Sequence, residues 1–397
     1  MEFRPHNRFE GFEDDWTIST IGDCFSERKE RSGQGEMISV TINSGIRKAK
    51  ELDRTVHISD TSNYKVVRQG DIAYNSMRMW QGASGYSPYD GILSPAYTVI
   101  TPKENILSEF FACLFKRPEQ IHIFELNSQG LTSDTWNLKY DKLKDIVVSY
   151  PKTMDEQHII AQFFKRLDTL IAAEDKKLEK QKSFKNASFE KMFPRKGETI
   201  PQIRFDGFKG EWAKKELNEV ACYYRVSNEN IHHQNLLSLS YGKIVKRNIK
   251  SKKGLLPASF DTYQVIKENI IVLRFTDLQN DHKSLRVGLS KEEGIISPAY
   301  VCLECKDSIN PDYLYLLLHY YDLCKVFYGM GDGMRQTLSY SDIKGLQLLV
   351  PKDEKEQQRI VDYFSRIDLL ISSQEKKLNL LRSLRKSFLE KMFVSVQ

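Results

Sequence analysis

Residues 151–193 read PKTMDEQHIIAQFFKRLDTLIAAEDKKLEKQKSFKNASFEKMF, and residues 351–393 read PKDEKEQQRIVDYFSRIDLLISSQEKKLNLLRSLRKSFLEKMF. The two segments share a leading proline, a Glu-Gln pair and a Glu-Lys-Met-Phe ending, at a constant offset of 200 residues. Their apolar residues fall at helical spacing and in the second segment largely follow a 3-4 heptad rhythm, which predicts a long helix with one buried stripe. Proline followed by acidic residues is typical of a helix start. We therefore expect two long helices of similar construction.

A long helix cannot bury its apolar stripe alone, so each predicted helix needs a partner. The nearest partner is the other copy, packed antiparallel as a coiled coil that acts as a spacer. The residues expected at this seam, or at a docking surface for a partner protein, are Ile160, Phe164, Leu167, Ile171, Leu178, Ile360, Phe364, Ile367, Ile371, Leu378 and Leu381.

The repeat extends over the whole chain. Arg-Phe-x-Gly-Phe opens each copy at residues 8–12 and 204–208 and is followed by Trp16 or Trp212, and Ser-Pro-Ala-Tyr occurs at 94–97 and 297–300. The residues between these markers differ strongly. An old duplication without functional meaning is one explanation, but the uneven divergence favours two modules that share a scaffold and read different things.

Short β-rich runs with turn residues between them fill residues 17–150 and 213–350, and helical patches interrupt them near 107–115 and 313–320. We therefore predict an α+β fold, with two mixed α/β domains in tandem repeat joined by the antiparallel helices. The predicted divisions are a first domain at 1–150, a central helix at 151–195, a second domain at 196–350 and a C-terminal helix at 351–397.

The composition sets broad limits. The 397 residues suit two ordinary domains, and the formal net charge of +6 is compatible with nucleic acid without indicating it. No apolar run is long enough to cross a bilayer and no signal-peptide core is visible, so we expect a cytoplasmic protein without a membrane partner. The six cysteines are too sparse for a disulfide framework and are expected to be reduced.

Catalytic motifs are incomplete. The sequence has no phosphate-binding G-x-x-x-x-G-K-[ST] loop, and Ser-Pro-Ala-Tyr lacks the first Asn/Asp and the second proline of a base-methylating loop. Cys302 and Cys305 form a lone C-x-x-C pair, expected to be core residues on opposite faces of a strand. Glu304 and Lys306 resemble a fragment of a metal-dependent nuclease. We assign no catalytic residue and no metal ligand.

DNA-reading residues are sought in polar loops, because Arg, Lys, Asn and Gln recognise base edges and phosphates. Each predicted domain has a polar segment after a strand and a second, glycine-containing loop before its last strand, and the second domain adds a basic cluster at 243–253. The same loops would also serve as ordinary turns. The candidates are Tyr74, Asn75, Arg78, Gln129, Thr132, Ser133, Lys243, Lys246, Arg247, Arg274, Arg335 and Gln336.

With its two Pro-x-x-x-x-Glu-Gln helix starts, its Lys-Lys-Leu steps and its repeated Arg-Phe-x-Gly-Phe opening, the chain resembles the specificity subunits of type I restriction-modification systems. The resemblance covers nearly all of it. It implies two target-recognition domains, each reading one half of a bipartite site in double-stranded DNA, with the helices as a ruler between them.

The resemblance also implies partner proteins. Two copies of a modification subunit would bind S-adenosylmethionine and methylate adenine, and a restriction subunit would use ATP and Mg to translocate and cleave DNA. The chain itself would be non-catalytic and bind no cofactor. Two alternatives stay open at this point: a coiled-coil interaction scaffold that does not bind DNA, and a nuclease working through Glu304 and Lys306.

Overall fold

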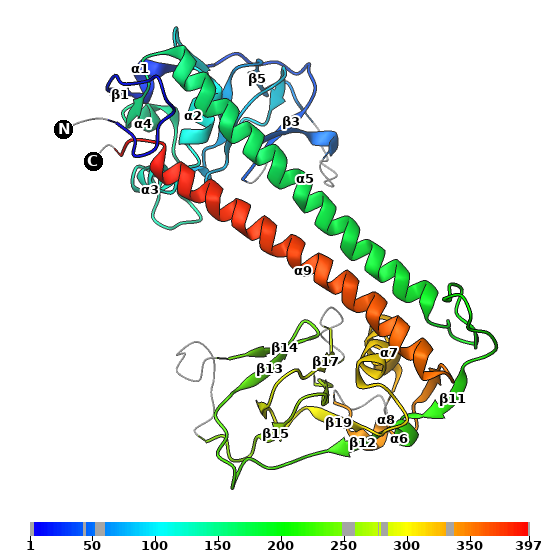
Figure 1. The fold of residues 1–397 in the computed structure, drawn as a ribbon. Helices are drawn as coiled ribbons and strands as arrows, with labels where there is room; N and C mark the ends of the chain where they lie inside the picture. The colour runs from blue at the N-terminus through cyan, green and yellow to red at the C-terminus, as the bar shows by residue number, and fades with distance from the viewer. Residues whose placement is uncertain are drawn as a thin grey trace. The chain divides into compact units, whose positions relative to one another are not determined.

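The computed structural model describes residues 4–42, 45–51, 60–247, 259–276, 278, 285–330 and 337–395. The chain forms two compact units (Figure 1): unit 1 contains residues 1–176 and 375–397, and unit 2 contains residues 177–374. The predicted domain divisions follow the starts of the long helices, whereas the compact units divide inside those helices. Each unit therefore includes part of both long helices.

Unit 1 is built from short strands around small helices. Its elements are β1 (Thr17–Thr20), α1 (Ile21–Cys24), β2 (Phe25–Glu27), β3 (Ile38–Thr41), β4 (Gly45–Lys48), η1 (Ala49–Glu51), β5 (Lys65–Val67), β6 (Ile72–Asn75), η2 (Met79–Gln81), β7 (Ser84–Tyr86), β8 (Gly91–Leu93), β9 (Tyr97–Pro102), α2 (Ser108–Leu114), α3 (Pro118–Leu126), α4 (Tyr140–Leu143), β10 (Val147–Tyr150) and the first part of α5 (Met154–Met192). Its largest sheet has the order β2-β9-β6-β7, and β1-β10, β3-β4 and β5-β8 form pairs.

Unit 2 repeats this topology. Its elements are β11 (Ala213–Glu216), α6 (Leu217–Val220), β12 (Ala221–Tyr224), β13 (Leu237–Ser240), β14 (Lys243–Lys246), β15 (Gln264–Ile266), β16 (Ile271–Leu273), β17 (Val287–Leu289), β18 (Gly294–Ile296), β19 (Val301–Cys305), α7 (Pro311–Leu323), η3 (Val326–Gly329), α8 (Tyr340–Ile343), β20 (Gln347–Val350) and the first part of α9 (Glu354–Lys391). The sheet order β12-β19-β16-β17 and the pairs β11-β20, β13-β14 and β15-β18 match unit 1 strand for strand.

The predicted α+β class is confirmed, and so are the predicted strands and helical patches that carried it. The helical patch near residues 107–115 is α2, and the one near 313–320 is α7. None of the helices in the described part of the chain combines the length and the apolar content needed to span a bilayer.

In each unit, a phenylalanine just after the end of a long helix packs into the core. In unit 2, Phe193 at the end of α5 lies edge-on to Trp212, with ring centroids 6.1 Å apart. In unit 1, Phe393 at the end of α9 lies edge-on to Trp16 at 6.2 Å. The C-terminal residues thus complete the core of unit 1, which explains why the two ends of the chain lie side by side there (Figure 1).

The predicted antiparallel pairing of α5 and α9 is confirmed within each unit. In unit 1 Asp175 binds Arg382, with both carboxylate oxygens 2.8 Å from the same guanidinium nitrogen. In unit 2 the Lys185 ammonium lies 2.5 Å from Asp368. In unit 1 Asp168 also binds Arg385, and in unit 2 the Ser188 hydroxyl lies 3.0 Å from the Tyr363 hydroxyl. In each unit residue numbers therefore rise along one helix as they fall along the other, which is the antiparallel arrangement.

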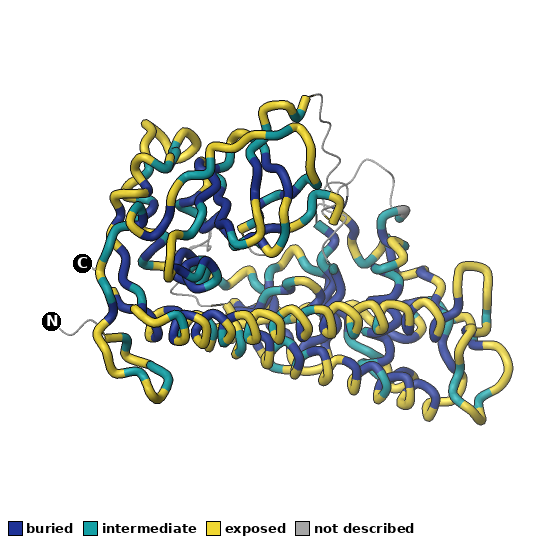
Figure 2. Tube along the Cα trace, turned by 90° about the horizontal axis from the view of Figure 1, so that it is seen from above, coloured by how far each residue is buried: buried dark blue, intermediate teal, exposed yellow. Residues whose placement is uncertain are grey.

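Buried and exposed residues alternate along the two long helices (Figure 2). Eight of the predicted seam residues are buried, namely Ile160, Phe164, Leu178, Ile360, Phe364, Ile367, Ile371 and Leu378. Leu167, Ile171 and Leu381 are half-buried. The buried side chains are not accessible to a partner protein in this conformation, and docking through the predicted seam residues stays a prediction.

The repeated Arg-Phe-x-Gly-Phe…Trp and Glu-Gln motifs form one buried cluster in each unit. The Glu156 carboxylate accepts hydrogen bonds from Arg8 Nε at 2.7 Å, Arg8 Nη2 at 2.8 Å and Trp16 Nε1 at 3.2 Å. Gln157 accepts from the Leu107 amide at 2.9 Å and donates to the Pro151 carbonyl at 2.9 Å. This cluster, which we call the helix-start lock, fastens the opening segment and helix α2 to the start of α5.

Candidate nucleic-acid interface

Two polar segments of unit 1 that the sequence singled out come together at the end of strand β6. The Leu138 amide donates to the Ser76 carbonyl at 2.8 Å. The Trp80 ring packs edge-on against Trp136, with centroids 5.3 Å apart. Residues 75–81 and 128–137 therefore form one continuous surface, which we call the tip of unit 1.

The tip of unit 1 exposes groups suited to a nucleic acid. The exposed side chains are Met77, Arg78, Gln129, Leu131, Thr132, Ser133, Asp134 and Thr135, of which Asp134 is acidic. Asn75 is half-buried, and its side-chain Oδ1 accepts a hydrogen bond from the Met77 backbone amide at 3.0 Å. Arg78 donates to Gln81 at 3.1 Å. The tip thus combines a guanidinium, amides and hydroxyls with the fully exposed apolar side chain of Leu131.

Tyr74, a sequence candidate for DNA reading, is fully buried. It lies within β6 with none of its surface exposed, and burial raises the pKa of its phenol well above the usual range. Strand alternation places it on the core face, so in this conformation it supports the tip from below.

The second segment of the tip has a well-defined backbone. Gln129 and Asn137 exchange two backbone hydrogen bonds of 3.0 and 2.8 Å, and the Thr135 amide donates to the Thr132 carbonyl at 2.9 Å. Gly130 has a φ of +150°, and a Cβ at this position would lie 2.7 Å from the Thr135 carbonyl oxygen. Only glycine fits here without displacing the backbone, so Gly130 shapes the loop that presents Leu131.

Unit 2 repeats the connection that builds the tip. The Leu338 amide donates to the Phe275 carbonyl at 3.3 Å, as the Leu138 amide donates to Ser76 in unit 1. Arg274 follows β16 directly and is half-buried. Arg335 and Gln336, the other two candidates here, lie outside the described residues. We call residues 274–276 the reading segment of unit 2.

The basic cluster of unit 2 begins on the hairpin β13-β14. Lys243, Lys246 and Arg247 are exposed. Lys246 lies 2.7 Å from Glu292, and its ammonium lowers the pKa of that carboxyl. Lys250, Lys252 and Lys253 lie outside the described residues. The corresponding hairpin β3-β4 of unit 1 exposes Arg47, a residue that sequence reasoning missed.

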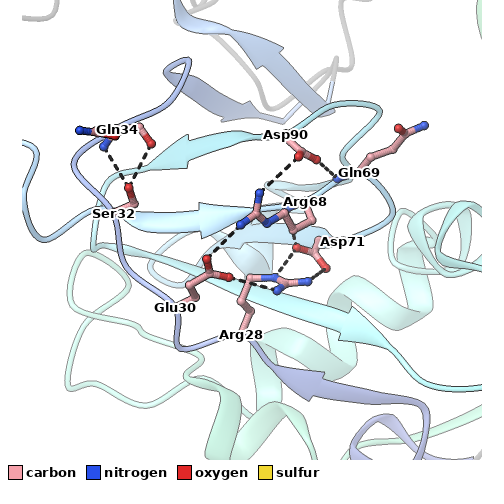
Figure 3. Close-up of polar contacts among 8 residues, drawn as sticks. All are labelled: Arg28, Glu30, Ser32, Gln34, Arg68, Gln69, Asp71 and Asp90. Atoms are coloured by element: carbon pink, nitrogen blue, oxygen red, sulfur yellow. Dashed lines mark hydrogen bonds and ion pairs between the residues drawn. The ribbon is translucent and has the colours of Figure 1, made fainter.

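A network of charged residues fixes the start of β6 in unit 1 (Figure 3). Arg28 binds the buried Asp71 through two hydrogen bonds of 2.7 and 3.0 Å, and the Arg68 amide donates to the same carboxylate at 2.7 Å. Arg68 also reaches Glu30 at 3.0 Å. In unit 2 the residue just before β16 is the buried Ile270. An ion-pair network therefore fixes the start of β6 in unit 1, whereas an apolar side chain is buried just before β16 in unit 2. The sequence alone did not reveal this difference.

The two other residues that sequence reasoning missed at the tip are Trp80 and Trp136. The chain has only four tryptophans, and two of them lie in the tip of unit 1. Their rarity was the available signal, but nothing local in the sequence indicates that residues so far apart form a pair.

The alternative catalytic fragments have structural roles. Ser-Pro-Ala-Tyr makes a turn into β9 and β19, in which the Tyr97 and Tyr300 amides donate to Ser94 and Ser297. Glu304 is 2.5 Å from Lys267, and Lys306 donates to the Asn218 carbonyl at 2.7 Å. Within the described ranges, no group of three or more His, Cys, Asp and Glu side chains is placed to hold a metal ion.

Cys302 and Cys305 are core residues, as predicted. They pack into different apolar clusters on opposite faces of β19. Burial raises the pKa of both thiols to about 12.

Comparison with known proteins gives two kinds of match. A family model described as "Type I restriction modification DNA specificity domain" matches residues 13–181 and again residues 209–383. Among solved structures, the type I restriction-modification system S subunit from M. genitalium is similar, with 15% sequence identity, a TM-score of 0.58, and 99% of this chain and 100% of that chain covered.

A second similar structure is described as the structural basis underlying complex assembly and conformational transition of the type I R-M system. It has 16% sequence identity and a TM-score of 0.55, and the match covers 98% of this chain and 100% of that chain. At such identities the structures show a shared fold. No curated protein sequence matches the chain.

Proposed function

Because this chain belongs to the type I restriction-modification DNA specificity family, which its two matches to the family model show, we propose that unit 1 and unit 2 each read one half of a bipartite DNA site. The observation that carries this proposal is the repeated tip. Both units use the same connection to join the end of a central strand to a second loop, but the residues presented there differ.

The chemistry of the tips suits readout in the major groove. Arginine pairs with guanine, and asparagine and glutamine pair with adenine, through hydrogen bonds to base edges. Arg78, Gln129 and Asn75 in unit 1 and Arg274 in unit 2 supply these groups. Leu131 adds an apolar side chain able to contact a thymine methyl or a base step.

The basic hairpins suit the DNA backbone. Lys243 and Arg247 are exposed on or beside β14, and Arg47 is exposed on β4. Contacts between such side chains and phosphates supply affinity without sequence preference and weaken as salt rises. We assign the tips to base readout and the hairpins to phosphate contact.

We further propose that two copies of one modification subunit dock on the long helices, one on each unit. Leu170 on α5 and Leu384 on α9, both in unit 1, are 42% and 41% exposed. Phe184 and Leu370 in unit 2 are 57% and 59% exposed and occupy the corresponding positions of the repeat. Each unit therefore has an equivalent exposed apolar pair, which we call the docking flank.

The exposed pairs Asp168–Arg385 and Asp175–Arg382 form what we call the ionic side of the helix pair in unit 1. The docking flank supports a site for partner subunits, because exposed apolar residues are typical of interaction surfaces. In this proposal S-adenosylmethionine, ATP and Mg are bound by the modification and restriction subunits, and this chain contributes recognition and position.

The decisive experiment exchanges residues 17–150 for the corresponding segment of a relative, in the full complex with its modification subunit. Methylated sites are then mapped by sequencing. We expect one half of the site to change and the other to remain. A change in both halves, or in neither, contradicts the division of reading between the units.

The scaffold alternative predicts a different result. If the chain does not bind DNA, the complex will show no salt-dependent retardation of duplex DNA even with the modification subunit present. Sequence-preferring binding of duplex DNA rules that alternative out.

A further inference from the structure

Unit 2 buries a whole arginine side chain directly beneath its reading segment. Arg286 has no exposed surface. Arginine stays charged at any physiological pH, and burying a charge is costly unless its donors are bound. The groups that bind its guanidinium therefore show which parts of unit 2 Arg286 holds in place.

The guanidinium binds backbone and side chain around it. Nη1 donates to the Thr276 carbonyl at 2.7 Å and to the Arg274 carbonyl at 3.2 Å, and Nε donates to the Tyr328 hydroxyl at 2.9 Å. The guanidinium also lies 5.4 Å from the centre of the Tyr328 ring. Two of these acceptors are carbonyls of the reading segment itself.

The backbone of Arg286 is fastened as well. Its amide donates to the Asp322 carboxylate at 2.6 Å, and its carbonyl accepts from the Arg274 amide at 2.9 Å. Asp322 lies near the end of α7, and Tyr328 lies in η3. Arg286 thus connects the reading segment to the helical layer of unit 2.

Unit 1 has no arginine at the equivalent position of its fold. The Asn75 amide donates to the Ala83 carbonyl at 2.9 Å, which makes Ala83 the counterpart of Arg286. In unit 1 the tip residue Met79, in η2, is fully buried, and Gly82 ends that turn with a φ of +78°. The common scaffold therefore does not require an arginine here, and Arg286 belongs to what is particular to unit 2.

We propose that Arg286 is a positioning residue for sequence reading by unit 2. It fixes the backbone of residues 274–276 and so determines how Arg274 meets the DNA. This inference rests on the proposed function, because it assigns Arg286 a role in the discrimination made by that unit.

The test compares Arg286→Met and Tyr328→Phe in the full complex with its modification subunit. The first removes every guanidinium hydrogen bond, and the second removes one acceptor while it keeps the ring. Binding is measured to DNA in which each half-site is varied separately. We expect Arg286→Met to reduce discrimination at the unit 2 half-site by about tenfold or more, and Tyr328→Phe to act in the same direction with a smaller effect. Discrimination at the unit 1 half-site should be unchanged.

The matched control is Arg204→Met, which removes an arginine from the helix-start lock of the same unit. It costs stability without touching the reading segment, so base preference should stay as in the native protein. Hydrogen exchange of unit 2 shows whether each variant is folded. If Arg286→Met does not fold, the discrimination of Tyr328→Phe at the unit 2 half-site tests the proposal.

Three results overturn the inference while the proposed function stands: full discrimination by a folded Arg286→Met, equal loss at both half-sites, or the same relaxation caused by Arg204→Met. A native complex without any sequence preference overturns the proposed function itself.

Discussion

Arg204 and Glu356 lie 152 residues apart in the sequence and form a two-pronged ion pair, with both nitrogen–oxygen distances 2.7 Å. Arg8 and Glu156 form the same pair in unit 1. The two carboxylates are only 1% and 2% exposed. The most recognisable repeated motifs of the chain are therefore part of the structural framework, because they bind each other in both units.

Breaking this pair is expected to destabilise its own unit. Glu356→Gln leaves the Arg204 guanidinium without its counter-charge, and loss of one partner of a buried pair costs about 3 kcal/mol or more. Hydrogen exchange with mass spectrometry measures this as faster exchange in unit 2. Asp175→Asn, which removes an exposed pair on the helices, is the control and should cost less than about 1 kcal/mol. Equal effects of the two substitutions would contradict a special role for the lock.

The tip of unit 1 is expected to contribute to DNA binding without contributing to stability. Arg78→Ala should weaken binding to the native site by roughly 5- to 150-fold, which corresponds to about 1–3 kcal/mol for a specific base contact. Leu131→Ala should weaken it less. Both side chains are exposed, so the unfolding midpoint should not move. Leu369→Ala, another highly exposed leucine, is the control. Unchanged affinity in both tip variants would remove the tip from the interface.

Substitutions in the docking flank are expected to change the number of modification subunits in the complex. Leu170→Glu with Leu384→Glu places charges on the flank of unit 1, and we expect the complex to lose one modification subunit and keep the other. Phe184→Glu with Leu370→Glu should have the same effect through unit 2. Native mass spectrometry counts the subunits. Asp175→Lys on the ionic side is the control, and loss of both subunits from either double variant would argue against two separate docking sites.

Helix length is expected to set the DNA spacer. Inserting seven residues into α5 and seven into α9 preserves the apolar stripe, because the stripe repeats every seven residues. We expect the number of base pairs between the two half-sites to change while both half-sites stay the same. Sequencing of methylated sites measures this directly. An unchanged spacer in an assembled complex would disprove the ruler.

Unit 2 should lose stability in mild acid through His319. Burial between Phe189 and Tyr315, with a smaller contribution from Lys185, lowers the pKa of its imidazole to about 4. The unfolded chain binds the proton near pH 6.5, so the folded state loses stability as pH falls from about 6.5 to 4, by up to about 3 kcal/mol. Above pH 6.5 both states are neutral and the effect disappears.

The measurement compares unfolding of the native protein with that of His319→Phe at pH 7 and pH 5. Phenylalanine keeps the aromatic packing and cannot titrate. The variant should lose less stability than the native protein between these two values. Parallel losses would mean that other groups control the acid response.

The sequence by itself determined the long helices, their antiparallel pairing, the α+β class and the doubled organisation. These features follow from local periodicity and from repeated motifs, which are present in the order of residues along the chain. The helical spacing of apolar residues in 151–193 specifies a helix wherever that segment lies, and the same holds for the short strands.

Only the tertiary structure decided how distant residues combine. It showed that Phe393 completes the core of unit 1, that Tyr74 is buried beneath the tip, that Trp80 meets Trp136, and that Arg286 supports the reading segment. Such contacts join residues from separate parts of the chain, and whether a side chain faces solvent or core depends on the surfaces that fold against it. The candidate DNA-binding surfaces are composed of these long-range contacts, which is why the sequence offered candidate loops but not their geometry.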